Sequence, residues 1–102
     1  MFLIVKGFQL LEKSVRKWLF QARLGDRFGP SEVGDSTFHM KFPFVEVVET
    51  EPFKIIKPLH LGLKEPRAIL EKGALWAYRL NEFRRRGKLP EQVLFAVGAP
   101  EG

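Results

Sequence analysis

A single long amphipathic segment, residues 65–87, constrains the fold of this chain most strongly. Its sequence, EPRAILEKGALWAYRLNEFRRRG, starts with a proline suited to a first helical turn and ends with a glycine suited to a left-handed C-terminal residue. The opposite side carries charged residues that include the pairs Arg67–Glu71 and Glu82–Arg86, four residues apart. We therefore expect one helix with one buried stripe. The stripe comprises Ile69, Gly73, Trp76, Leu80 and Phe83, widened by Leu70 and Ala77.

Residues 2–24 predict a strand followed by a second helix. The segment 2–10, FLIVKGFQL, is rich in strand formers and short enough for a buried strand. Apolar residues then recur at helical spacing, which predicts a helix over 11–24 that Gly25 closes. The predicted buried residues are Leu11, Val15, Trp18 and Ala22, and the predicted outer face carries Lys13, Arg16, Lys17 and Arg23, with Phe20 exposed among them.

The middle of the chain predicts a loop and a β-hairpin. Residues 25–36, GDRFGPSEVGDS, contain several turn formers and no periodic pattern, so we expect a surface loop. Apolar residues alternate over 37–49 and again over 53–63, which predicts two strands joined by a turn at 50–52. Pro43 cannot donate to a strand ladder, so we place it at an edge or a bulge. Residues 93–97 predict a last short strand, and 98–102 are expected to fray.

The predicted elements follow the order strand, helix, strand, strand, helix, strand. This is the order of the ferredoxin-like βαββαβ fold, an α+β fold with an antiparallel four-stranded sheet and two helices on one face. Right-handed crossovers would place the first and third strands at the centre of that sheet. The alternative is another small α+β meander, in which Pro43 divides the second strand. In both cases 102 residues suffice for a single domain, 1–102, with its own core.

Composition indicates a folded protein without disulfides. The chain is 45% hydrophobic and 13% aromatic, which argues against disorder. It contains no cysteine, which excludes disulfides and cysteine-ligated metals. The apolar start FLIV ends at Lys6 and is too short for a membrane span or a signal sequence, so we expect a cytoplasmic protein that does not contact membranes. A single asparagine and many charged residues are typical of thermophile proteins.

No residue pattern predicts a catalytic site, a metal or a cofactor. The glycines of the 25–36 loop match neither GxGxxG nor GxxxxGK[ST], and no serine lies in a GxSxG motif. His39 and His60 would be diagonal neighbours if Thr50 and Glu51 formed a two-residue hairpin turn, with Glu46 as a third metal ligand. We instead expect both histidines to face solvent. The chain is thus predicted to be a binding module rather than an enzyme.

The basic residues gather in the two helical segments. The net charge is +5, and it is distributed as +4 over 1–25, −4 over 26–51, +7 over 52–88 and −2 over 89–102. If the two helices lie side by side, their outer faces form one basic surface, to which Phe20 and Tyr78 add stacking rings. Such a surface is typical of nucleic-acid binding. The predicted contacts are Lys13, Arg16, Lys17, Phe20, Arg23, Arg84, Arg85 and Arg86.

An alternative interpretation is a homo-oligomeric domain. A small sheet with both helices on one face leaves its other face open, and an apolar open face must be covered. The first strand is apolar at both alternations, which favours a homodimer packed sheet to sheet. Such a dimer would bind a small molecule or a protein partner. The sequence does not distinguish this role from nucleic-acid binding, nor DNA from RNA.

Overall fold

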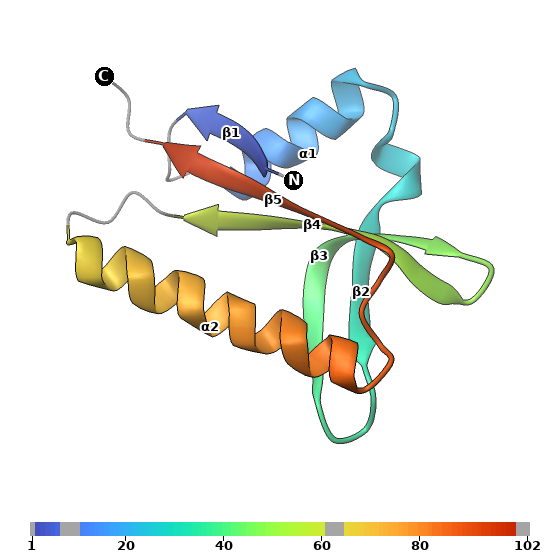
Figure 1. Ribbon diagram of the computed structural model, residues 1–102. Helices are drawn as coiled ribbons and strands as arrows, with labels where there is room; N and C mark the ends of the chain where they lie inside the picture. The colour runs from blue at the N-terminus through green and yellow to red at the C-terminus, as the bar shows by residue number, and fades with distance from the viewer. Residues whose placement is uncertain (1, 7–10, 61–64, 100–102) are drawn as a thin grey trace.

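The chain forms a five-stranded mixed sheet with one helix on each face. The computed structural model describes residues 2–6, 11–60 and 65–99 (Figure 1). The predicted α+β class and its two helices are confirmed, whereas the predicted four antiparallel strands are wrong. In chain order the elements are β1 (Phe2–Lys6), α1 (Leu11–Gln21), the short 3-10 helix η1 (Gly25–Arg27), β2 (Gly29–Gly34), β3 (His39–Val48), β4 (Glu51–His60), α2 (Pro66–Arg85) and β5 (Gln92–Ala99).

The strand order of the sheet is β1-β5-β4-β3-β2. β1 pairs with β5, and β5 with β4, in parallel, while β3 runs antiparallel to both β4 and β2. The first strand therefore lies at an edge instead of the centre that the ferredoxin-like fold requires. The difference originates in β2, which lies inside the segment predicted as a loop. The sequence of β2, GPSEVG, buries a single apolar side chain, Val33, so it carries no alternating pattern to reveal it.

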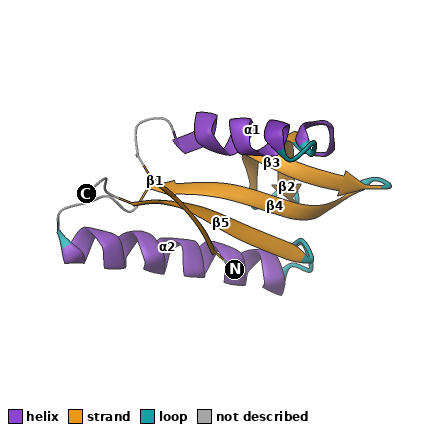
Figure 2. Cartoon of the chain, turned by 90° about the horizontal axis from the view of Figure 1, so that it is seen from above, coloured by secondary structure: helices purple, strands orange, loops and turns teal. Residues whose placement is uncertain are grey.

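The two helices cover opposite faces of the sheet, which corrects the prediction that they share one face (Figure 2). The connection β4–α2–β5 moves towards β1, while the connection from β1 through α1 to β2 crosses the sheet in the reverse direction. Crossovers of the usual right-handed kind that run in opposite directions place their helices on opposite faces. The added strand β2 at the far edge thus determines where α1 packs.

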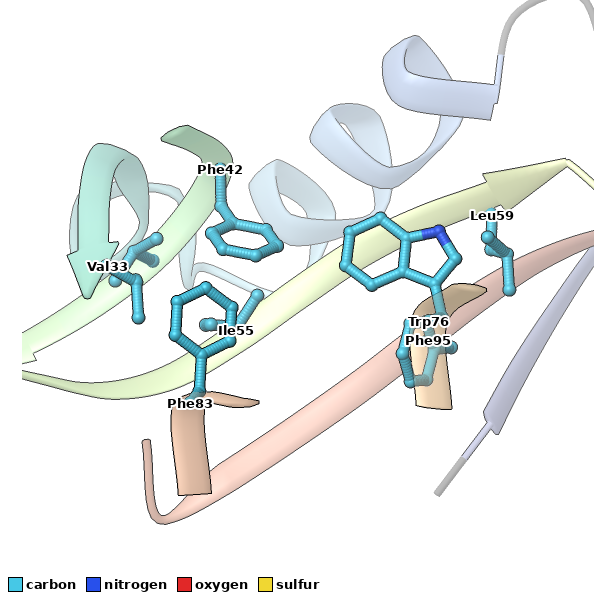
Figure 3. Close-up of a cluster of buried hydrophobic side chains, with 8 residues drawn as sticks. Val33, Phe42, Ile55, Leu59, Trp76, Phe83 and Phe95 are labelled. Carbon is cyan, nitrogen blue, oxygen red and sulfur yellow. The ribbon is translucent and has the colours of Figure 1, made fainter. Parts of the chain in front are cut away.

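An aromatic cluster joins α2 to the sheet (Figure 3). Trp76 and Phe83, seven residues apart, are the buried residues of α2 and lie on one side of the helix. The ring of Phe83 lies 4.9 Å from that of Phe38 and 6.2 Å from that of Phe42, centroid to centroid. The predicted stripe is confirmed at Trp76 and Phe83. It is wrong at the exposed Gly73, and its widening is wrong at Leu70, which is 73% exposed, and at the exposed Ala77.

A second, smaller cluster lies under α1. It contains Val15 and Leu19 of α1 and Phe44, Ile56 and Ala96 of the sheet. The prediction that Trp18 is buried is wrong, because Trp18 is 40% exposed and Leu19 takes the core position four residues after Val15. Ala22, predicted to be buried as well, follows the end of α1 and is exposed.

A β-bulge in β3 lets this strand supply both clusters. Gly29 pairs with Val45 and Ser31 pairs with Phe42, so β3 has one more residue than β2 between these two pairs. The extra residue reverses the side-chain alternation. As a result, Phe42 packs on the α2 side and Phe44 on the α1 side, although they are two residues apart. Pro43 lies within the bulge, as predicted.

Several predicted boundaries move by a few residues. Val48 pairs with Glu51, so the β3–β4 turn is centred on Glu49 and Thr50, one residue earlier than predicted. Ala99 belongs to β5 instead of a frayed end. The parts of the predicted strands that fall on 7–10 and 61–63, and the end of the predicted tail at 100–102, lie outside the described residues.

The sheet-to-sheet dimer was predicted from an open sheet face, but helices pack on both faces of the sheet in the described residues, and Val47 and Val48 near the β3–β4 turn remain 46% and 49% exposed. One face packs against α2 and the other against α1. Burial of the β1 side chains, on which that prediction also depended, lies outside the described residues. A homodimer remains a prediction.

Candidate nucleic-acid interface

The outer side of α1 carries basic residues around one exposed aromatic ring. Lys13, Arg16, Lys17 and Phe20 are spaced by one to four residues and fall on one side of the helix. Phe20 is 78% exposed. The opposite side of α1 holds the buried Val15 and Leu19, so the orientation of the helix is fixed by its packing. We call this row of four residues the α1 row.

The basic residues of the α1 row differ in whether they interact with other residues of the chain. Arg16 lies 3.8 Å from Glu12, and its guanidinium lies 5.5 Å from the centre of the Phe44 ring. Within the described residues, Lys13 and Lys17 form no ion pair, and both are exposed. The two lysines thus offer their charge to an external partner, while Arg16 is partly occupied by its neighbours.

Arg23 ends α1 in a left-handed conformation. Its φ is 60°. The N–H of Arg23 donates to the carbonyl of Phe20 at 3.0 Å, and the N–H of Leu24 donates to the carbonyl of Leu19 at 2.8 Å. These two bonds form a Schellman motif, in which glycine is the usual left-handed residue. The prediction that Gly25 closes the helix is therefore wrong. A side chain in this conformation costs about 1 kcal/mol, so the chain keeps an arginine here at the expense of stability.

A hollow adjoins the α1 row at the end of the helix. Its volume is about 450 Å³, and it is lined by Phe20, Gln21, Arg23, Gly25 and Asp26. Arg27 follows in η1 and is exposed. We did not predict Arg27 as a site residue, because the segment 25–36 was interpreted as an ordinary loop. A signal was present: Arg27 lies four residues after Arg23 and continues the spacing of the basic residues before it.

Arg85 and Arg86, at the other end of the predicted surface, are held in an ion-pair network within the chain. Glu82 accepts hydrogen bonds from Nε and Nη2 of Arg85 at 2.9 and 3.0 Å and from Nε of Arg86 at 3.2 Å. Arg86 also donates to Asp35, in the loop before β3, at 3.3 Å. The guanidinium of Arg86 lies 5.7 Å from the centre of the Phe38 ring. The network therefore ties the end of α2 to the β2–β3 connection.

The electrostatics of this network agree with a structural role. Hydrogen bonds from Arg85 and Arg86 lower the pKa of Glu82. The pKa of Asp35 is also lowered, chiefly by the N–H of Phe38, with further hydrogen bonds from Thr37 and Arg86. Both arginines have raised pKa values, because their partners favour the charged form. These two cations therefore have partners before any ligand binds.

The predicted basic residues form two separate groups and do not join into one surface. Lys13, Arg16, Lys17, Phe20 and Arg23 lie on or just after α1, whereas Arg84, Arg85 and Arg86 lie at the end of α2, on the other side of the sheet (Figure 2). Tyr78, the second predicted stacking ring, is 59% exposed but belongs to α2. The prediction associated these residues with the two helices correctly, but it placed both helices on one face of the sheet, whereas they lie on opposite faces.

The histidine pair does not form the diagonal arrangement that we considered. Ile56 is the last residue of β4 in register with β3, so His60 has no neighbour on that strand. The side chain of His60 lies outside the described part of the chain. Nδ1 of His39 lies 2.6 Å from Glu32 on β2. No group of three or more potential metal ligands occurs among the described residues.

Neither described helix is long and apolar enough to cross a membrane. Comparison with known proteins identifies no relative: no protein-family model, no curated protein and no solved structure matches this chain.

Proposed function

We propose that this protein binds single-stranded nucleic acid through the α1 row and the turn that ends α1. The observation that carries the proposal is the 78% exposure of Phe20 beside Lys13 and Lys17, which form no ion pair within the described residues. An exposed ring of this kind stacks on any base, and each such contact contributes about 1–3 kcal/mol to binding. A duplex keeps its bases stacked inside and offers no face to Phe20, so we expect a preference for single strands.

The basic residues around Phe20 supply the phosphate contacts. Lys13 and Lys17 precede the ring along the helix, and Arg23 and Arg27 follow it. If these four cations each neutralise one phosphate, log K should fall with log salt at a slope of about −3. Asp26 lines the hollow beside Phe20 and repels phosphate. We therefore place the backbone along the lysines and a base edge at the hollow, where a carboxylate accepts amino hydrogens.

The test is a fluorescence-anisotropy titration with labelled single- and double-stranded DNA and RNA across a salt series. Phe20→Ala should weaken single-strand binding roughly 5- to 150-fold. Leu70→Ala is the matched control, because Leu70 is an equally exposed apolar residue, at 73%, on the other helix. If Phe20→Ala binds single strands as tightly as the wild type does, the proposal is wrong.

A second variant separates binding from folding. Arg23→Gly places glycine at a left-handed position, so we expect it to increase stability by up to about 1 kcal/mol. The same variant removes one phosphate contact, so it should weaken binding and reduce the salt slope by about 0.7. A variant that is more stable and still binds less tightly cannot owe its loss of affinity to unfolding. Unchanged affinity and slope would remove Arg23 from the interface.

The exposed Arg84 provides the control for charge. Arg84→Gln removes the same charge as a variant of the α1 row, but on the far side of the sheet. The double variant Arg85→Ala with Arg86→Ala is less suitable, because it also breaks the network with Glu82 and Asp35. We expect Arg84→Gln to leave single-strand affinity near that of the wild type.

A further inference from the structure

A second hollow adjoins α1, next to the turn that ends the helix. Its volume is about 100 Å³, and Trp18 lines it together with Leu24 and Arg27. Trp18 is 40% exposed, so part of this residue is accessible to a ligand. We call this cavity the Trp18 hollow. It lies on the α1 face of the sheet, as does the hollow beside Phe20 (Figure 2).

The floor of the Trp18 hollow is apolar. It is formed by Leu19 of α1, Ile56 of β4 and Leu94 of β5. Leu19 and Ile56 are buried in the cluster under α1, and Leu94 packs against that cluster opposite Ile56. Together with the indole of Trp18, this floor favours the flat face of an aromatic ring.

The rim of the Trp18 hollow is charged. It carries Arg27, Glu46 and Lys54. Glu46 and Lys54 are opposite each other on β3 and β4, two residues beyond the buried pair Phe44 and Ile56, so they lie on the same side of the sheet as that pair. Among the residues that the structure describes, none of these three charged side chains forms an ion pair. The rim therefore presents a carboxylate acceptor and two cationic donors to a ligand.

The size and chemistry of the Trp18 hollow fit a single nucleobase. Pockets for drug-sized ligands have volumes of about 300–1,000 Å³, so this smaller hollow suits one flat group. A nucleobase has a face that stacks on aromatic rings and an edge that carries hydrogen-bond donors and acceptors. The face matches Trp18 and the apolar floor, and the edge matches Glu46 and Lys54.

The Trp18 hollow and the hollow beside Phe20 share one short turn, residues 24–27. Gly25 and Asp26 line the hollow beside Phe20, whereas Leu24 and Arg27 line the Trp18 hollow. A nucleic-acid strand that passes from Phe20 around the end of α1 therefore reaches Trp18 by way of this turn. Arg27 is exposed at that point and can contact the phosphate between two successive bases.

We propose that the Trp18 hollow holds a second base of the single strand that stacks on Phe20, and that Glu46 selects a base with an exocyclic amino group. This inference rests on the proposed function, because it concerns the same strand. The indole of Trp18 stacks on the base, and Lys54 donates to a ring acceptor beside the amino group. A base in a duplex has its edge occupied by its partner, so this site also requires a single strand.

Glu46 distinguishes cytosine and adenine from thymine and uracil. The amino groups of cytosine and adenine donate hydrogen bonds that a carboxylate accepts. Thymine and uracil carry no amino group, and their ring N–H lies between two carbonyl oxygens that repel a carboxylate. The wild type should therefore bind a deoxycytidine homopolymer at least about 5-fold more tightly than a thymidine homopolymer of equal length.

The first test follows tryptophan emission as each homopolymer is added. The chain has two tryptophans, and Trp76 is buried on the other side of the sheet. A base stacked on Trp18 should quench part of the emission, and Trp18→Leu should abolish this change. The same variant keeps an apolar side chain over the hollow but should weaken binding of the deoxycytidine homopolymer at least about 5-fold. Tyr78→Leu is the matched control, because Tyr78 is an exposed ring on the other helix.

The second test uses Glu46→Gln, which keeps the shape of the side chain. An amide both accepts and donates hydrogen bonds, so this variant should bind the two homopolymers about equally. Glu51→Gln is the matched control, because Glu51 lies on the same hairpin but lines a different hollow. We expect it to keep the wild-type preference for deoxycytidine.

The outcomes separate this inference from the proposed function. If Phe20→Ala weakens single-strand binding but Trp18→Leu does not, the proposed function holds and the second base site is wrong. If Glu46→Gln keeps the wild-type preference, Glu46 does not select the base. If neither Phe20→Ala nor Trp18→Leu weakens binding, both proposals are overturned.

Discussion

Phe83 is the side chain whose removal should damage the fold most. It is fully buried and belongs to the cluster that joins α2 to the sheet. Its ring contacts Phe38 and Phe42, at centroid distances of 4.9 and 6.2 Å. Phe42 immediately precedes the bulge of β3, so Phe83 connects α2 with the part of β3 that has turned away from β4.

The expected effect of Phe83→Ala follows from these contacts. Replacing a buried phenylalanine with alanine costs about 3–5 kcal/mol, because apolar contact is lost and a cavity remains. Two ring pairs, each with a contribution of about 0.5–1.5 kcal/mol, place this residue towards the upper end of that range. Small domains have total stabilities of about 5–15 kcal/mol, so the variant should be marginally folded. Phe83→Leu, which fills most of the cavity, should cost about 1–2 kcal/mol.

Urea unfolding followed by circular dichroism measures both variants. Leu70→Ala is the control on the same helix, and we expect it to change the unfolding free energy by less than about 0.5 kcal/mol, since Leu70 is 73% exposed. A loss below about 2 kcal/mol for Phe83→Ala would refute the reasoning. An equal loss for Leu70→Ala would show that the outer face of α2 is also covered.

Three further predictions concern turns and ion pairs. Gly34 has a φ of +123°, and a Cβ there would overlap backbone atoms at the start of β3, so Gly34→Ala should prevent normal hairpin formation and lower the thermal midpoint sharply. Gly87 has a φ of +69° with open space around it, so Gly87→Ala should cost only about 1 kcal/mol in urea unfolding. The pKa values of Asp35 and Glu82 are lowered from 3.8 and 4.5, so their stabilising contribution is complete above those values and is lost as the pH falls through the lower folded-state values. Arg86→Met removes one of the groups that lower these two pKa values, so it should partly flatten the acid dependence in a pH series of urea midpoints, and an unchanged series would exclude Arg86 as a source of it.

The long helix and the main strands could be predicted from local signals. Pro66 and Gly87 mark the ends of α2, and its buried residues recur at helical spacing. The position of Pro43 in a bulge followed from its missing N–H. β2 could not be recognised, because Val33 is its one buried apolar residue and its glycines and proline are typical of loops.

The candidate site was predicted only where it depends on local sequence patterns. Exposure of Lys17 and Phe20 depends on the periodicity of α1, which is a local property that the sequence carries. The relation between the two helices depends on the order of strands, which is set by pairing between distant segments. Lys57 and Arg79 meet at the ring of Trp76 only after β4 and α2 pack together, so no spacing in the sequence indicates that contact.

The pairing of β1 with β5 affects how the chain acquires its fold. Phe2 lies opposite Phe95, so this edge of the sheet closes only after β5 has been made. β2, β3 and β4 follow one another as neighbours and can pair early, whereas parallel pairing between distant segments is slow. During synthesis, β1 precedes the other four strands of this sheet and is the last of them to find its partner. In that interval its unpaired backbone can associate with another chain, so the earliest strand is the one most exposed to misassembly.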